Sequence, residues 1–461
     1  MSLELQSFLD SPVFRDRLAF LRQSEAWPRP RLEALQISEL QRVLLLARAK
    51  VPFYQRLFGD HAWRPEQFTS LKHLRRLPLV DKEAIMARPG DFLAQDHDPR
   101  QLMTRTTGGS TGEPLVVYFD FATKCRDLAN TFYYVGVPGF DPRQHRSIRL
   151  YGDRVEVDEA AGVYWTWESP AKAIFSAYHV SEHTCRRYVE QINALAPHYL
   201  HGRPSAVAPL CQEISRQGLK VSPGVSYIFL EGEILPPVQR QVIEQALGGR
   251  VLITYGHTEG ALLGFSCPHS RHIHMAPQVG VVELLAADGS AITAPGQPGE
   301  IVVTGFNNDV LPLLRYRTGD LGRWAAESCP CGRQYPLLAE VQGRIQDFVV
   351  SARGQAVPLT PALFNYNEVD WSQTLRFQVR QDQPGRLLLS IVPRPQAGLG
   401  QDLAAALARQ LAGVLPEGFT VHGQAVPEIE RTPRGKYKYL VQKLDLRPYL
   451  EGPEPREEEA P

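Results

Sequence analysis

The chain has 461 residues, 43% of them hydrophobic, and its 50 lysine and arginine residues balance 50 aspartate and glutamate residues. This length can bury a large core and predicts two or three domains. The balanced charge, with no basic run among aromatic residues, predicts no nucleic-acid partner. No apolar run is long enough to span a bilayer, and the N-terminus lacks the pattern of a signal peptide. We therefore expect a cytoplasmic protein with no membrane partner, in which the six cysteines stay reduced.

The order of the predicted elements indicates an α/β fold. Roughly the first hundred residues have the pattern of helices joined by proline-rich connections, clearest from Leu40 to Lys50. After Ser147 short apolar runs alternate with helical stretches, which is typical of parallel strands in α/β proteins. The expected strands are 147–151, 227–230 and 251–255, and the expected helices are 185–196 and 237–247. Beyond Val279 the chain turns strand-rich, with strands expected at 281–285 and 300–304.

The remaining residues predict a second, smaller domain. Strands are expected at 348–351, 375–379 and 387–392, and a helix is expected at 402–414. We therefore predict a large N-terminal domain over residues 1–342, with parallel sheets and a strand-rich subdomain. A small mobile α+β lid domain follows over residues 343–447. The charged, proline-rich residues 448–461 are expected to be a disordered tail.

One stretch combines hydroxyl groups and glycines in a way that suits a polyphosphate. Its residues are Thr106, Thr107, Gly108, Gly109, Ser110, Thr111, Gly112, Glu113 and Pro114. Glycines free the backbone to present successive N–H donors, and the hydroxyls add neutral donors. No lysine follows, so the stretch is not a Walker A loop. A plain polar turn is the alternative interpretation.

Four further segments follow in the order that a two-domain ATP enzyme requires. Tyr255 and Gly256 lead into His257, Thr258 and Glu259 at the end of an expected strand, where α/β proteins bind ligands. Further on come segment 315–321 with an aspartate at position 320, the polar segment 343–347, and the basic segment 431–438. Taken alone, each segment could equally be a solvated turn.

Together these motifs resemble the adenylate-forming enzyme superfamily, and within it the phenylacetate-coenzyme A ligase-like branch, over essentially the whole chain. The resemblance implies that the Thr106–Pro114 stretch is the phosphate-binding loop and that Tyr255 stacks on adenine. It places Thr258 and Glu259 at the phosphates and Mg²⁺. It implies that Asp320 and Arg344 contact the ribose. Lys436 would lie between the substrate carboxylate and the α-phosphate. The segment of Glu231, Gly232 and Glu233 would lie along the adenine.

The implied activity is ATP-dependent activation of a carboxylic acid as an acyl-adenylate with release of pyrophosphate. Transfer of the acyl group to coenzyme A is the expected second step. The sequence departs from its relatives at Gln346, where they usually have aspartate or lysine, so hinging is expected to differ. The loop 352–358 resembles the thiol-tunnel loop of the family, but nothing in it is diagnostic of coenzyme A.

Three other functions stay open at this point. The enzyme could hand the adenylate to an amine, a hydroxyl, a carrier protein or a reductase partner. A nucleotide-binding relic without catalysis is a second alternative, against which the retained Lys436, Glu259 and Asp320 argue. A regulator that senses an acyl-adenylate is a third, although no DNA-binding motif supports it. The sequence also leaves the assembly open, with a homodimer among the candidates.

Cysteines and histidines form a second constellation with the chemistry of structural zinc. We expect Cys267, His274, Cys329 and Cys331 to be the four ligands, with His269 and His272 as substitutes. Some members of the resembled branch carry zinc here. The alternative is three unconnected buried thiols. The other three cysteines, Cys125, Cys185 and Cys211, are expected in the core or on helix surfaces.

The acyl pocket is predicted from aromatic residues that lie between the phosphate loop and the adenine motif. They are Tyr133, Tyr134, Trp165, Trp167, Phe175 and Tyr178. Such rings would fit an aromatic acid, although large aromatic side chains are normally buried for packing. The segment 201–205 resembles the part of the family near the acyl pocket, and Arg203 could equally belong to a structural ion pair.

Overall fold

The computed structural model describes residues 3–107, 115–151, 153, 155–177, 179–233, 235, 237–344, 348–364, 369, 371, 373–393, 400–429, 439–446 and 449. The N-terminal part is helical, as predicted. Its helices are α1 (Leu3–Leu9), α2 (Pro12–Ser24), α3 (Arg29–Lys50), α4 (Pro52–Asp60) and α5 (Lys82–Ala87). Short 3-10 helices lie on either side of α5, at Pro65–Gln67, Leu71–Arg76, Pro89–Phe92 and Pro99–Gln101.

Polar caps fix where several helices begin. The Ser11 side chain accepts a hydrogen bond from the Val13 backbone N–H at the start of α2, and the Asp81 side chain does the same for Ala84 at α5. Helix α6 (Phe121–Gly136) begins after Asp120, whose carboxylate accepts from the Thr123 N–H at 2.7 Å. Each cap satisfies a backbone donor that has no partner within the helix.

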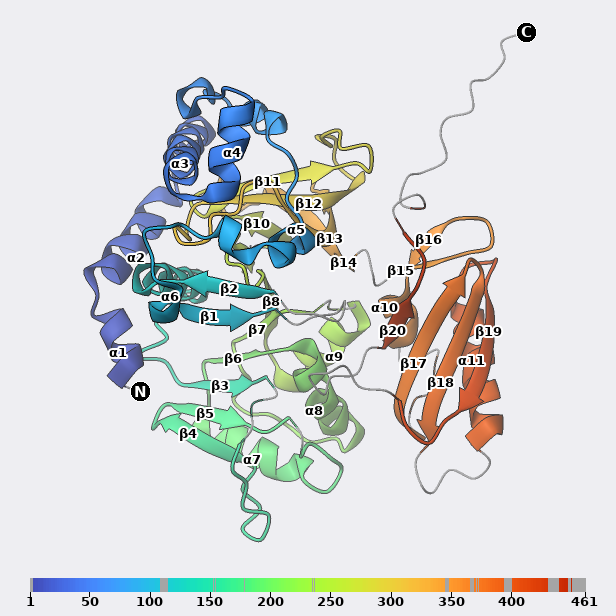
Figure 1. Ribbon diagram of the computed structural model, residues 1–461. Helices are drawn as coiled ribbons and strands as arrows, with labels where there is room; N and C mark the ends of the chain where they lie inside the picture. The colour runs from blue at the N-terminus through green and yellow to red at the C-terminus, as the bar shows by residue number, and fades with distance from the viewer. Residues whose placement is uncertain are drawn as a thin grey trace.

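A mixed sheet of twelve strands forms the centre of the molecule (Figure 1). Its order is β11-β12-β13-β14-β10-β9-β8-β7-β6-β3-β5-β4. The parallel part contains β3 (Ser147–Leu150), β5 (Lys172–Phe175), β6 (Tyr199–Gly202), β7 (Tyr227–Glu231) and β8 (Arg250–Tyr255), with β4 (Trp165–Ser169) antiparallel at the edge. The strand-rich continuation contains β9 (Gly264–Cys267), β10 (Ser270–Met275), β11 (Gly280–Leu285), β12 (Pro298–Gly305), β13 (Tyr316–Trp324) and β14 (Leu337–Arg344).

Alternating side chains bury both faces of the parallel strands. Ile228 and Leu230 of β7 pack with helices α7 (Cys185–Leu195), α8 (Pro204–Arg216) and α9 (Pro237–Leu247). Phe229, between them, packs into a different core with α2 and α6. Because successive side chains of a strand point to opposite faces, the apolar run of β7 requires cover on both sides. Helices therefore lie on both faces of the parallel strands.

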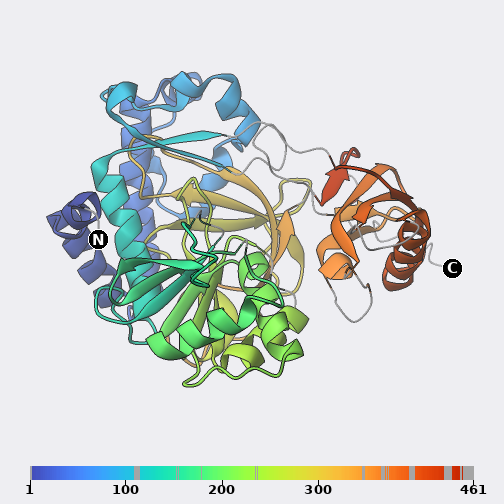
Figure 2. The same ribbon diagram turned by 90° about the horizontal axis from the view of Figure 1, so that it is seen from below.

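Three smaller sheets complete the described fold. Strands β1 (Met103–Thr106) and β2 (Val116–Phe119) form an antiparallel hairpin, and β15 (Phe348–Val350) pairs with β16 (Ala356–Pro358). A four-stranded sheet has the order β19-β18-β17-β20 and lies beside the main body in both views (Figures 1 and 2). Its elements, with the two nearby helices, are α10 (Leu359–Phe364), β17 (Thr374–Gln383), β18 (Arg386–Pro393), α11 (Gly400–Val414), β19 (Thr420–Ala425) and β20 (Leu440–Gln442).

The four-stranded sheet has a core of its own beneath α11. Ala404, Leu407 and Leu411 of α11 are buried in one cluster with apolar residues of β17 and β18. Gly423 of β19 lets this helix approach, because a Cβ there would lie 2.0 Å from the Ala404 carbonyl oxygen. This part contains the strands predicted at 375–379 and 387–392 and the helix predicted at 402–414, whereas the strand predicted at 348–351 is β15 in the neighbouring two-stranded sheet. Among the described residues, no helix combines the length and the apolar character that crossing a membrane requires.

Candidate active site

The hairpin of β1 and β2 anchors both ends of the predicted phosphate-binding stretch. Thr106 pairs with Val116, and the Thr107 N–H donates to the Leu115 carbonyl at 3.0 Å. The Leu115 N–H donates in turn to Thr107 Oγ1 at 3.0 Å. These bonds hold the two ends of the stretch side by side. Residues 108–114, which include Gly108, Gly109, Ser110, Thr111 and Gly112, lie outside the described residues.

Two residues expected at the nucleoside meet although they are far apart in the sequence. The Tyr255 hydroxyl at the end of β8 donates to Asp320 Oδ2 of β13 at 2.8 Å. Asp320 pairs across the sheet with Arg344 of β14. The backbone of Arg344 is thus next to Asp320, and its side chain lies outside what the structure describes. The structure brings together the positions predicted to hold the adenine and the ribose.

Glu259 is buried and accepts two hydrogen bonds. Its Oε2 lies 3.0 Å from His257 Nδ1, and its Oε1 accepts from the Tyr316 hydroxyl at 2.8 Å. Burial alone would raise the pKa of Glu259, but the hydrogen bond and charge of His257, with the Tyr316 hydroxyl, lower it to about 2. The carboxylate is therefore ionised at neutral pH, as a ligand of Mg²⁺ must be.

A polar cluster lies at the carboxyl ends of β6 and β7. His201 Nε2 lies 2.8 Å from the Tyr151 hydroxyl, 3.2 Å from the Tyr134 hydroxyl and 3.4 Å from Glu231 Oε2. Burial would raise the pKa of Glu231, but contact with His201 and Tyr151 lowers it to about 2. The next residue, Gly232, has a φ of +75°, a conformation that favours glycine. Glu231 is thus held by its neighbours at the edge where parallel strands bind ligands.

The predicted aromatic pocket is not found among the described rings. Phe175 and Trp165 pack in the core under α7 and α8, whereas Tyr133 and Tyr134 belong to the core on the opposite face of the sheet. Trp167 is 47% exposed on the edge strand β4. Tyr178 lies outside the described residues. Of the described members of this set, Tyr134 reaches the polar cluster, and the others pack or face solvent.

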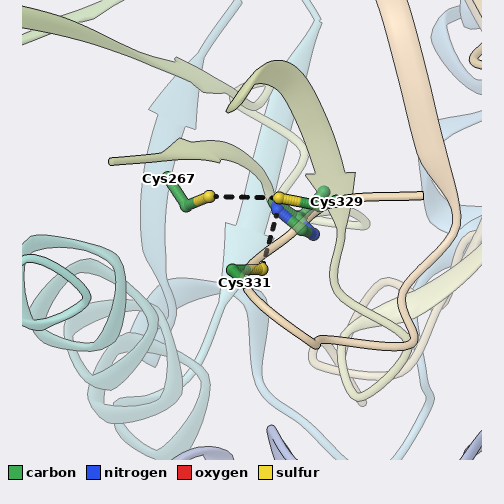
Figure 3. Close-up of side chains that lie close together, drawn as sticks. Cys267, Cys329 and Cys331 are labelled. Atoms are coloured by element: carbon green, nitrogen blue, oxygen red, sulfur yellow. Dashed lines mark hydrogen bonds between the residues drawn. The ribbon is translucent and has the colours of Figure 1, made fainter. Parts of the chain in front are cut away.

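The cysteine and histidine residues predicted to bind metal come together. One ligand atom from each of Cys267, His274, Cys329 and Cys331 lies within 4.8 Å of the others. Cys267 Sγ lies 3.5 Å from Cys329 Sγ, and Cys331 Sγ lies 3.6 Å from His274 Nε2. Figure 3 shows the side chains of the three cysteines close together. Burial, and then the charges of Arg333 and His272, lower the pKa of His274 to about 4. Its imidazole is therefore neutral, the form that binds a metal. His269 and His272 are not in the group.

The remaining predicted site residues fall in undescribed segments or carry no resolved role. Lys436 lies in residues 430–438, outside the described part, and so does Gln346 in residues 345–347. Thr258 lines a cavity beside Glu259. Glu233 follows Gly232 at the exposed end of β7. Gly256 lies between Tyr255 and His257 in the turn after β8.

Sequence reasoning missed several partners of these residues. Tyr316 binds Glu259 from 57 residues away, and Tyr151 binds His201 from 50 residues away. The first contact depends on how β13 lies beside the turn after β8, and the second on the pairing of β3 with β6, which no local pattern in the sequence reveals. Arg105, two residues before Thr107, lines the cavity beside Thr258 and Glu259. Its position in an expected strand gave no reason to predict it as a site residue.

Comparison with known proteins identifies the fold. No family model matches the chain. It is 27% identical over 339 residues to a phenylacetate-coenzyme A ligase of Thermus thermophilus, covering 71% of this chain and 73% of that protein. It is 24% identical over 400 residues to protein CapK of Staphylococcus aureus, covering 85% of each. A crystal structure of 2-hydroxyisobutyryl-CoA ligase in the postadenylation state, in complex with R3-HIB-AMP, matches with a TM-score of 0.65 at 21% identity over 93% of each chain. The resemblance to the phenylacetate-coenzyme A ligase-like branch, predicted from the motifs, is confirmed.

Proposed function

We propose that this protein, which resembles the phenylacetate-coenzyme A ligase-like branch in both motif order and fold, is an AMP-forming acid ligase. It activates a carboxylic acid with ATP as an acyl-adenylate, releases pyrophosphate, and transfers the acyl group to coenzyme A. The observation that carries the proposal is that Tyr255 and Glu259, at and just after the end of β8, bind Asp320 and Tyr316 of the same strand, β13, while Glu259 shares a cavity lining with the β1–β2 hairpin.

The chemistry of the first step suits these residues. A carboxylate that attacks the α-phosphate brings two anions together, so cations and donors must lie where charge develops. No general base is needed because the attacking carboxylate is already ionised. Glu259 and Thr258 are the residues that would hold Mg²⁺, which supplies positive charge to the departing pyrophosphate when bound. Tyr255 would stack on the adenine, with Glu231, Gly232 and Glu233 along it.

The cation for the attacking carboxylate would come from the small domain. We place the boundary between residues 1–342 and 343–447, at Gly343 near the end of β14, where φ is +104°. Lys436 would bridge the substrate carboxylate and the α-phosphate, and Arg344 would reach the ribose that Asp320 holds. Rotation of residues 343–447 would then withdraw Lys436 and open a path for the thiol of coenzyme A.

A structural zinc ion is the ligand that best suits the Cys267, His274, Cys329 and Cys331 cluster. Three thiols and one neutral imidazole within 4.8 Å of one another match the ligand set of structural zinc. His274 Nδ1 is buried and has no hydrogen-bond partner among the described residues. The contact that the ring makes within the cluster is through Nε2, which faces Cys331 Sγ and is the nitrogen that would bind the metal. When bound, zinc would cross-link β9, β10 and the segment before β14, and so stabilise the fold.

The acid is a small-molecule carboxylate, and proteins that share this fold act on different acids. The curated relatives include phenylacetate-coenzyme A ligases, and the matching structure is a 2-hydroxyisobutyryl-CoA ligase. Because the predicted aromatic rings do not gather at the site, we propose that the panel of test acids include both aryl and short hydroxy acids.

The experiment that tests the function is acid-dependent pyrophosphate release from ATP. A panel of aryl, arylacetic, hydroxy and fatty acids is offered with and without coenzyme A. We expect at least one acid to stimulate release, Lys436→Ala to abolish the stimulation, and the matched control Lys438→Ala to retain it. Formation of AMP that depends on coenzyme A would support the second step. Equal activity of the two lysine variants would contradict the role given to Lys436.

A further inference from the structure

A cavity lies where the β1–β2 hairpin meets α6 and the turn after β8. Its volume is about 10 Å³, which is room for about one water molecule, and it is partly open to solvent. Its described lining is Arg105, Val117, Phe119, Thr123, Asp127, Thr258, Glu259, Gly260 and Asn308. The cavity therefore joins the strand that leads into the glycine-rich stretch to the turn that contains Glu259. Among the described lining residues, Arg105 is the basic one.

Arg105 is held in this cavity by two neighbours. Its Nη2 lies 2.7 Å from Asp127 Oδ2, and its Cζ lies 4.3 Å from the centre of the Phe119 ring. Arg105 pairs with Val117 across the hairpin, so Phe119 is its diagonal neighbour. The side chains of Arg105 and Asp127 are 31% and 19% exposed, so the guanidinium is fixed but accessible. A guanidinium has five N–H donors, more than its contact with one carboxylate oxygen uses.

Asp127 in turn lies against the turn that contains Glu259. Its Oδ1 is 3.6 Å from the position that a Cβ on Gly260 would take. Gly260 has a φ of +71°, so the turn follows a path that glycine favours, and it passes within ordinary contact distance of Asp127. The ion pair thus connects the hairpin, α6 and the Thr258–Gly260 turn.

The glycine-rich stretch itself lacks a cation. Residues 106–114 contain no lysine or arginine and include Glu113. A departing pyrophosphate accumulates negative charge, which donors and cations must stabilise where it develops. An arginine is suited to this because its fork of N–H donors matches phosphate oxygens. Arg105 shares a cavity lining with Thr258 and Glu259, so a polyphosphate whose Mg²⁺ these two residues would hold would lie at the mouth of this cavity, next to Arg105.

We propose that Arg105 binds the β- and γ-phosphates of ATP and the pyrophosphate that leaves, and that Asp127 positions its guanidinium. This role rests on the proposed function, because it uses the same nucleotide site. It adds to that function a phosphate-binding residue outside the glycine-rich stretch.

Nucleotide binding without any acid tests the role of Arg105. Isothermal titration calorimetry measures the dissociation constants of MgATP, magnesium pyrophosphate and AMP for the wild type, Arg105→Met, Arg105→Lys and Asp127→Asn. We expect Arg105→Met to weaken MgATP and pyrophosphate roughly 10- to 100-fold and to leave AMP within roughly twofold. Arg105→Lys keeps the charge and should recover part of the loss. Asp127→Asn keeps an oxygen acceptor for Arg105 and should change MgATP affinity less than Arg105→Met does.

The outcomes separate this role from the proposed function. An unchanged ratio of MgATP to AMP affinity in Arg105→Met, with the wild type binding both, would refute the role of Arg105 alone. Equal weakening of all three ligands in Arg105→Met and Asp127→Asn would also refute it, because the pair would then only support the fold. A wild type that binds none of the three would refute the nucleotide site, and with it both proposals. If Arg105→Met does not fold, Arg105→Lys is judged by the same ratio.

Discussion

Replacement of Glu259 by glutamine should remove a pH-dependent part of the stability. The pKa of Glu259 in the folded protein is about 2, against 4.5 for an unperturbed glutamate. A lowered pKa means that the folded state favours the carboxylate, by about 3.4 kcal/mol at 1.36 kcal/mol per pKa unit. This stabilisation is present above pH 4.5 and is lost as the pH falls toward 2. Between pH 7 and pH 3.5 the loss amounts to about 1.4 kcal/mol by the same linkage.

The comparison of wild type with Glu259→Gln removes the ionisation of Glu259 and, with it, its ion pair with His257. Glutamine keeps the size of the side chain but cannot ionise, so it has no such pH dependence. Glu231 also has a pKa of about 2, but it is present in both proteins and cancels in the difference. The assay is urea unfolding followed by tryptophan fluorescence at several pH values from 7 to 3.5. We expect the difference in unfolding free energy to shrink by about 1.4 kcal/mol over this range. A difference that stays constant would refute the burial and hydrogen bonding described for Glu259.

Three further predictions concern the metal cluster, a buried ion pair and the adenine edge. The purified protein should contain one zinc ion per chain by mass spectrometry of the metals. His274→Gln and Cys331→Ser should lose it, whereas Cys211→Ser, a buried thiol outside the cluster, should keep it. Arg315→Met should lower the free energy of unfolding by about 3–5 kcal/mol, because it leaves Glu283, whose side chain is only 13% exposed, without the partner 3.0 Å away. The double variant with Glu283→Leu should recover most of that loss in urea unfolding, and failure to recover would contradict the pairing. Tyr255→Ala should weaken AMP and MgATP binding alike in calorimetry, since both share the adenine, and an effect on MgATP alone would contradict its assignment.

Local patterns in the sequence were enough to predict β3, β7, β8, α7 and α9 of the parallel part, whereas β4, β5, β6 and α8 were not predicted. The helix at 237–247 begins and ends where α9 does, and the strand at 227–230 differs from β7 by one residue. Apolar runs and helical periodicity determine such elements directly. The strand-rich continuation was recognised, but its union with the parallel strands in one sheet was not. That union depends on β8 pairing with β9, and the short run of β9 gives a weak signal by itself.

The candidate site was predicted as a list of motifs, and its geometry was not. Tyr255 and Asp320 were assigned to one nucleotide, and the structure places their side chains 2.8 Å apart. The hydrogen bond from Tyr316 to Glu259 could not be predicted, because it depends on how β13 lies beside the turn after β8. The aromatic pocket was wrong for the described rings, because Phe175 of β5 packs in the core under α7 and α8, whereas Tyr133 belongs to helix α6, which packs in the core on the opposite face of the sheet.

The most direct test of the acid-ligase account follows an oxygen atom from the acid into AMP. An acid that supports pyrophosphate release is labelled with ¹⁸O in its carboxylate and incubated with ATP, Mg²⁺ and coenzyme A. If the carboxylate attacks the α-phosphate and coenzyme A then displaces AMP, one labelled oxygen must remain on AMP, which mass spectrometry detects. We predict this single label in AMP together with the acyl-coenzyme A product. Label in inorganic phosphate, or AMP without label, would contradict the formation of an acyl-adenylate.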